Sequence, residues 1–201
     1  MAAVAALLAC GAADVAPAAP ETDMVIRLGA AIGKIELGMT PPQVRRAFGR
    51  PHVTVYRRAD FGARGRYLEL GWELPGRNSW EPVLWQVGFR STSRRAPLRV
   101  TRIATTARRE RTPQRIGIGS RLRDVVRAYP SARCVTRFFQ MPHPHTWVVV
   151  PGRGGMTAFQ VVESRPASSV PTPFFVNTVM VQRQWFSTGA GHDECPPNWR
   201  G

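Results

Sequence analysis

The stretch KIELGMTPPQVRRAFGRP at residues 34–51 returns in altered form as RIGIGSRLRDVVRAYPSA at residues 115–132. Gly38 aligns with Gly119, and the same offset aligns the apolar positions of both stretches. The matched apolar pairs are Ile35 with Ile116, Val44 with Val125, Ala47 with Ala128 and Phe48 with Tyr129. Self-similarity at a constant offset is typical of a duplicated structural unit. We therefore expect two related units.

Each copy predicts a short extended segment, a turn at glycine and then a short helix. Thr40 and Ser120 are expected to begin the two helices, because both residue types cap helix N-termini. Pro41 suits a first helical turn. Val44 and Phe48 lie four positions apart, so the first helix has one narrow apolar face.

Strand-like segments follow each helix. They cover residues 67–74, 83–90 and 99–105 after the first helix, and 133–140, 146–150, 157–162 and 175–185 after the second. In the first of them Leu68, Leu70 and Trp72 alternate onto one face. We expect an α+β fold of two tandem units, each a short helix packed on a three- or four-stranded antiparallel sheet. Residues 24–110 form the first unit and residues 111–201 the second.

The start of the first unit carries a resemblance to a known family. LGMT at residues 37–40, followed by QV at 43–44 and FGRP at 48–51, resembles the opening of SmpA/OmlA-type outer-membrane lipoprotein domains. Two tandem copies on an exported chain further resemble the architecture of the beta-lactamase inhibitory proteins. The resemblance implies short helical segments packed on small antiparallel sheets. It also implies a binding or scaffold protein of the cell envelope, with no catalytic residues.

The N-terminal segment predicts export. Residues 1–9, MAAVAALLA, are small or apolar and lead into Cys10. LLAC at residues 7–10 resembles a lipobox, at which bacterial lipoproteins are cleaved and lipidated on cysteine. The run is too short to span a bilayer but fits the end of a signal-peptide hydrophobic region. We expect residues 1–23 to be an export signal and linker with Cys10 as the lipidation site; the alternative is an Ala-rich tail with a chance cysteine.

The other two cysteines predict a disulfide bond. With Cys10 processed separately, Cys134 and Cys195 remain, and an even pair in an exported chain favours a disulfide. Such a bond would stabilise the fold by about 2–4 kcal/mol, mainly by restricting the unfolded chain. The alternative, for a cytosolic protein, is two reduced and buried cysteines.

The net charge of +15 predicts attraction to polyanions, such as anionic lipid, cell-wall polymer, nucleic acid or an acidic protein face. Arginines gather between residues 90 and 115, and Arg94, Arg95, Arg99 and Arg102 are the candidate anion-binding side chains. The alternative is that these arginines belong to a solvated linker and bind no particular anion. Trp80, in a loop, is expected to be exposed and available to a partner.

The search for catalytic chemistry is negative. His143, His145 and His192 could supply metal ligands, but nothing specifies a complete ligand set, and exposed turn histidines are the better explanation. Ser120 lacks the Gly-x-Ser-x-Gly elbow of serine hydrolases. The glycine-rich turn at residues 152–155 lacks the Lys-Ser/Thr of a phosphate-binding loop. We therefore expect no catalytic residues, no cofactor and no metal.

Together these patterns predict a non-catalytic extracytoplasmic module of the cell envelope, secreted or lipid-anchored to the membrane. Its partner would be a protein, or an anionic envelope polymer or lipid. The alternative is an enzyme with an unrecognised site in the cleft between the repeats, which predicts titratable groups clustered in a concave pocket. A specific nucleic-acid partner is not expected, because the chain lacks a nucleic-acid-binding motif.

Overall fold

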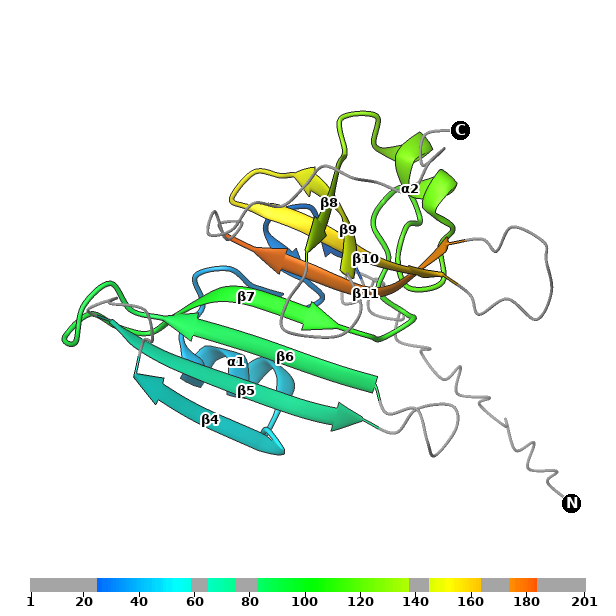
Figure 1. Ribbon diagram of the computed structural model, residues 1–201. Helices are drawn as coiled ribbons and strands as arrows, with labels where there is room; N and C mark the ends of the chain where they lie inside the picture. Colours follow the sequence, from blue (N-terminus) through cyan, green and yellow to red (C-terminus); the bar gives the residue numbers. More distant parts are fainter. Residues whose placement is uncertain (1–24, 59–64, 75–82, 138–144, 164–173, 184–201) are drawn as a thin grey trace, which may run out of the picture.

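The computed structural model describes residues 25–58, 65–74, 83–137, 145–163 and 174–183 of the 201-residue chain. These residues are mainly β-strand (Figure 1). In chain order the elements are β1 (Ile26–Arg27), β2 (Ala31–Ile32), β3 (Ile35–Glu36), α1 (Pro41–Phe48), β4 (Val53–Arg58), β5 (Arg66–Leu74), β6 (Val83–Arg90), β7 (Arg99–Thr105), α2 (Leu122–Ala128), β8 (Arg133–Arg137), β9 (His145–Pro151), β10 (Met156–Glu163) and β11 (Phe174–Gln182).

One eight-stranded antiparallel sheet dominates the fold. Its strand order is β4-β5-β6-β7-β11-β10-β9-β8, so two meanders of four strands meet in the middle. The joint is the antiparallel pair of β7 and β11, in which Ile103 lies opposite Val181. Both of these side chains are fully buried. A smaller sheet holds β1, β2 and β3.

The expectation of two helix-on-sheet units, each with its own three- or four-stranded sheet, was wrong. The last strand of each meander pairs with the other, so the sheet continues across both halves. The pairing has a physical reason, since an edge strand left alone exposes a row of unpaired backbone groups. The hydrophobic core is shared in the same way, because one cluster of buried residues runs from β5 to β10.

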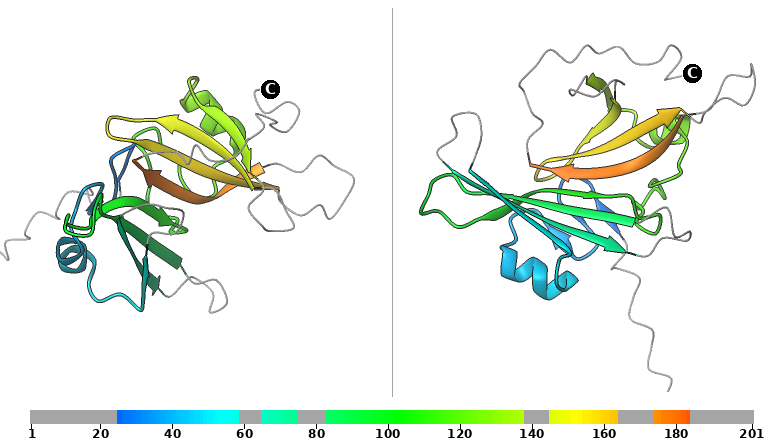
Figure 2. Two further views of the ribbon diagram at one scale, coloured as in Figure 1. Left: turned by 60° about the vertical axis from the view of Figure 1, so that its left-hand side comes forward. Right: turned by 60° about the horizontal axis from the view of Figure 1, so that its bottom comes forward.

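The helices cover one face of the large sheet, which we call the inner face and define by Leu68, Val87, Ile103 and the residues that alternate with them. Phe48 of α1 packs edge-on against Trp72, with ring centroids 5.2 Å apart, and against Trp85 at 4.7 Å. In the other half, Tyr129, the residue after α2, stacks on Phe159 at 6.1 Å. Figure 2 shows α1 against one side of strands β4 to β7.

The small sheet connects the two halves of the molecule. Gly29, in the turn between β1 and β2, donates its N–H to Thr157 Oγ1 of β10 at 2.9 Å. Its φ is +66°, a conformation that favours glycine. A Cβ at this position would lie 2.5 Å from Gly155 O and 2.7 Å from Gly152 Cα, so only glycine fits against the β9–β10 turn. An N-terminal segment is thereby held by the C-terminal meander.

The two helix starts differ from each other. Thr40 caps α1 as predicted, and its N–H donates to Gln43 Oε1 at 2.8 Å. The prediction for Ser120 was wrong, because Arg121 is the N-cap of α2. The Ser120 hydroxyl instead accepts the Gly117 N–H at 3.1 Å and closes the preceding turn.

Strand β4 and the small sheet were missed by the sequence reasoning, and the predicted strands otherwise have counterparts in β5 to β11. The second face of the large sheet, opposite the helices, is the outer face. We define it by Tyr67 and Glu69 of β5, Gly88 and Arg90 of β6, and Arg102 of β7. Both helices and the small sheet pack on the inner face, so none of these described elements covers the outer one.

Candidate functional site

Strand alternation gathers polar side chains on the outer face of strands β5 to β7. Tyr67 and Glu69 flank the buried Leu68 and therefore point to the opposite side of the sheet. The register places Glu69 opposite Gly88, and Gly88 opposite Arg102. Strands β5, β6 and β7 thus bring Glu69 and Arg102 to the two sides of Gly88, which has no side chain.

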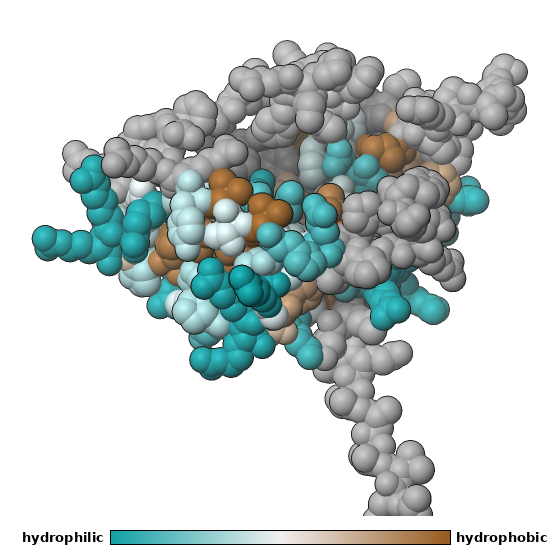
Figure 3. All heavy atoms as spheres, turned by 90° about the horizontal axis from the view of Figure 1, so that it is seen from below, coloured by the Kyte–Doolittle hydropathy of each residue, from teal (hydrophilic) through white to brown (hydrophobic). Residues whose placement is uncertain are grey.

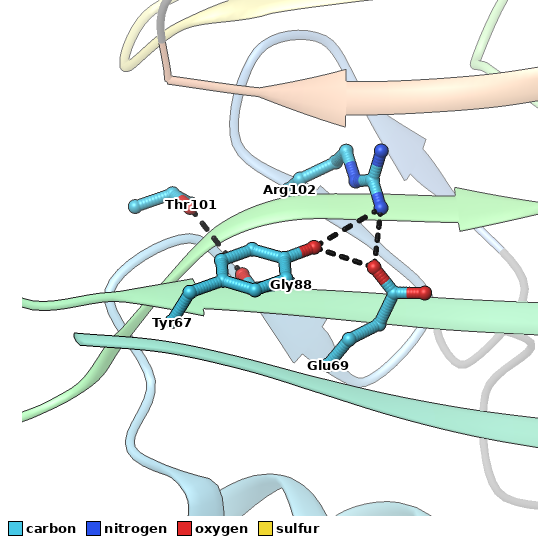
Figure 4. Close-up of polar contacts among 5 residues, drawn as sticks. All are labelled: Tyr67, Glu69, Gly88, Thr101 and Arg102. Carbon is cyan, nitrogen blue, oxygen red and sulfur yellow. Dashed lines mark hydrogen bonds and ion pairs between the residues drawn. The ribbon is translucent and has the colours of Figure 1, made fainter. Parts of the chain in front are cut away.

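A hydrogen-bonded network joins these groups (Figure 4). Arg102 Nη2 donates to Glu69 Oε2 at 2.7 Å, and the Tyr67 hydroxyl donates to the same oxygen at 2.5 Å. Arg102 Nη2 also lies 3.4 Å from the Tyr67 hydroxyl oxygen. The Arg90 guanidinium carbon lies 6.0 Å from the centre of the Tyr67 ring, within the range of a cation–π contact. We call Tyr67, Glu69, Arg90 and Arg102 the outer-face cluster.

Gly88 makes room for this cluster. A Cβ there would lie 3.4 Å from the Tyr67 hydroxyl and 3.5 Å from Arg102 Cβ and Nε. The sheet also has a bulge between Gly88 and Phe89, which changes the local direction of the strand. These are ordinary van der Waals distances, so an alanine would fit, whereas a longer side chain would meet the tyrosine and the arginine.

Burial and charge determine the protonation of Tyr67. Burial raises the pKa of the Tyr67 hydroxyl, and the nearby cation of Arg102 partly opposes this. The hydrogen bond to Glu69 raises the pKa further, since it needs the proton on the tyrosine. Tyr67 is therefore a stable donor at neutral pH. The ion pair of Arg102 and Glu69 is only about a quarter exposed, at 29% and 25%, so water screens it less than a surface pair.

A shallow depression of about 90 Å³ opens beside the cluster. Gly71 of β5 lies in its floor, because a glycine leaves the outer face of the strand bare. Its lining also includes Glu69 and Glu73, and the aliphatic side chains of Val53 and Leu84. The outer face therefore combines a polar network with a shallow hollow that has apolar walls.

The predicted arginines are dispersed. Only Arg102 belongs to the outer-face cluster, while Arg94 and Arg95 are exposed in the connection between β6 and β7. Arg99 donates to Gly38 O at 3.2 Å and so holds the turn after β3. Trp80 lies outside the described residues. The four arginines thus do not meet at one anion site in the described part of the chain.

The predicted cysteine and histidine sites fall largely outside the described residues. Cys134 is buried on β8, but Cys10 and Cys195 lie outside, so the disulfide and the lipidation stay predictions. His143 and His192 also lie outside. Among the residues that the structure describes, no three His, Cys, Asp or Glu side chains are grouped as metal ligands. No helix in that part of the chain is long and apolar enough to cross a membrane.

One buried carboxyl stands apart from the outer-face cluster. Glu110, between β7 and α2, is 9% exposed, and its Oε2 atom has no hydrogen-bond partner among the residues that the structure describes. Burial raises the pKa of this carboxyl, and the cations of Arg109 and Arg111 only partly oppose the effect.

Tyr67 and Glu69 were missed by the sequence reasoning. The alternation that put Leu68, Leu70 and Trp72 on one face also put Tyr67 and Glu69 together on the other, so a signal for this pair existed. Arg102 lies on a different strand, and its approach depends on strand register, which alternation does not reveal.

Comparison with protein-family models, curated proteins and solved structures finds no match to this chain.

Proposed function

We propose that the protein is a non-catalytic extracytoplasmic binding module of the cell envelope, which holds a protein partner on its outer face at the outer-face cluster. The observation that carries this proposal is the network of Tyr67, Glu69 and Arg102, partly exposed on a sheet face that no described helix covers. Tyrosine and arginine are the residue types most enriched among energetically important interface residues.

The network favours binding because it is already ordered. A flexible arginine loses side-chain entropy when a partner immobilises it, at a cost of about 0.5–1.5 kcal/mol. Arg102 and Tyr67 are held by Glu69 before any partner arrives, so less of this cost remains. The depression over Gly71 adds a hollow in which a partner side chain can be buried.

The charge of the surface indicates the chemistry of the partner. Arg90 and Arg102 contribute two cations to the outer face and Glu69 and Glu73 two anions, so the excess positive charge comes from the rest of the chain, which carries +15 in total. Complementary charge speeds association and selects partners. An acidic protein face therefore fits best, and an anionic envelope polymer or lipid is the competing ligand. The export signal predicted at residues 1–23 and the disulfide predicted between Cys134 and Cys195 are the sequence features that favour a location outside the cytoplasm.

The test is affinity capture from a detergent-solubilised envelope fraction with the full chain. Arg90→Ala is compared with Arg123→Ala, a matched control on α2 whose side chain is 62% exposed and lies on the inner side of the sheet. We expect one protein to be recovered by the wild type and the control, and about tenfold less by Arg90→Ala, which corresponds to about 1.4 kcal/mol.

Two results would contradict the proposal. Equal recovery by both variants would place the binding surface elsewhere. Recovery of anionic polymer or lipid alone, released in parallel from all three proteins by salt, would reduce the interaction to general charge attraction.

A further inference from the structure

Strand β4 forms an open edge of the large sheet. It stands first in the strand order and pairs with β5 on one side, from Val53 opposite Gly71 to Arg58 opposite Arg66. Backbone groups of a strand point alternately to its two neighbours, so an edge strand leaves every second residue without a ladder partner. Within the described residues, no strand pairs with the other side of β4.

The side chains of β4 are suited to pairing with another strand. Its first four residues are Val-Thr-Val-Tyr, which are all β-branched or aromatic and favour strands. Val53 is 46% exposed and Tyr56 is 70% exposed, and they point to opposite faces of the sheet. Seen from below, hydrophobic residues gather among hydrophilic ones on the side of the molecule where β4 lies (Figure 3). An exposed edge of this kind is a template for strand addition.

The surroundings of this edge are basic. The chain that enters β4 carries three exposed arginines, Arg45 and Arg46 in the last turn of α1 and Arg50 just after it. Exposed Arg66 lies on the neighbouring strand. The nearby Glu69 is already paired with a cation inside the sheet. Exposed Glu73 on β5, near the start of β4, is one opposing charge. Four arginines against this one carboxylate leave the edge net positive, and an acidic strand complements it.

We propose that β4 is a docking edge for an extended, acidic segment of a partner protein, which pairs with it and adds a ninth strand to the sheet. Backbone hydrogen bonds supply affinity in this mode, and alternate side chains supply specificity. Val53 and Val55 contact the added strand on one face, and Tyr56 contacts it on the other. A second copy of this chain fits less well, because it presents the same arginines and the same charge of +15. This inference does not rest on the outer-face cluster.

The test uses a fluorescein-labelled peptide of about ten residues that alternates Glu with Val, long enough to span the six residues of β4. One control peptide alternates Lys with Val, and another alternates Glu with Pro, which keeps the charge but removes the backbone donors. Fluorescence anisotropy with the full chain should give an affinity for the Glu–Val peptide at least about tenfold higher than for either control. Hydrogen exchange should slow at the amides of β4 and stay unchanged in β10.

Matched variants locate the site. Tyr56→Asp places a repelling charge at the edge and should weaken binding by about tenfold or more. Val162→Asp, on β10 and 38% exposed, should leave peptide binding unchanged. Circular dichroism checks that each variant is folded.

Four outcomes would overturn the inference. In the first, the Glu–Pro peptide binds as tightly as the Glu–Val peptide, and in the second, the Glu–Val peptide does not bind at about 1 mM. In the third, the peptide binds but hydrogen exchange at the β4 amides does not slow. In the fourth, the free chain forms a stable dimer in which the β4 amides are already protected.

Discussion

Replacing Gly29 tests whether the two halves of the molecule are held together as the structure describes. Gly29→Ala adds one methyl group where the Gly155 carbonyl oxygen lies 2.5 Å away and the Gly152 Cα 2.7 Å away. Both neighbours are backbone atoms of the β9–β10 turn, so they cannot give way by changing a rotamer. The β1–β2 turn must move off the C-terminal meander, and the hydrogen bond to Thr157 at 2.9 Å is weakened.

The magnitude follows from two costs. An alanine held at positive φ costs about 1–2 kcal/mol, and an overpacked site costs about 1–3 kcal/mol more. Gly29→Ala should therefore lower the free energy of unfolding by about 2–5 kcal/mol. Gly119→Ala is the matched control, because its φ is +85° and no atom lies within 4 Å of the added Cβ. Gly119→Ala should lower the free energy of unfolding only by the cost of holding an alanine at positive φ, about 1–2 kcal/mol.

Urea unfolding followed by tryptophan fluorescence measures both values. Hydrogen exchange then compares amides of β5 and β6 with amides of β10 and β11. In one cooperative sheet, Gly29→Ala should speed exchange in both groups by global unfolding. Equal destabilisation by the two alanines would refute the close contact. Loss of protection confined to one half would refute the shared core.

Three further predictions concern charge and cysteine. Arg102→Gln should lower the free energy of unfolding by about 1–2 kcal/mol, because its pair with Glu69 is only about a quarter exposed. Arg27→Gln, at a half-exposed pair, should lower it by less than about 0.5 kcal/mol, and equal urea midpoints for the two variants would contradict this. The raised pKa of the Glu110 carboxyl stabilises the fold at low pH, and that contribution is lost as pH rises through the native pKa. The free energy of unfolding of Glu110→Gln should therefore equal that of the wild type in acid and be higher by about 1–3 kcal/mol at alkaline pH. A difference that stays constant across a pH series would show that the carboxyl does not titrate in that range. Cys134→Ser should cost about 2–4 kcal/mol and leave Cys195 open to alkylation, whereas alkylation of both thiols in the native wild type would exclude the bond.

Local patterns in the sequence predicted the elements well. The helix at residues 41–48 follows from Thr40 as a cap and from the spacing of Val44 and Phe48, which are properties of neighbouring residues. Strand β5 follows in the same way from strict alternation. These patterns need no knowledge of the rest of the chain. The capping residue of the second helix was misplaced by one position, because Ser120 is used in the turn before it.

The pairing of distant strands was beyond such patterns. The joint of β7 with β11 brings Ile103 opposite Val181, and alternation says which face a residue occupies but not which strand lies beside it. The meander of each half could be anticipated from chain order. The pairing of β7 with β11 could not be anticipated from chain order, and because of it the two expected sheets form one continuous sheet.

For the candidate site too, some features follow from the sequence and others only from the tertiary structure. By itself, the sequence determined the strongly basic charge, the helix that Thr40 begins and the placing of Tyr67 and Glu69 on one face of a strand. Only the tertiary structure decided that Arg102 reaches Glu69 across Gly88, and that β4 remains an open edge. Periodicity is a local property, encoded in neighbouring residues, whereas register and edges depend on which distant strands find each other.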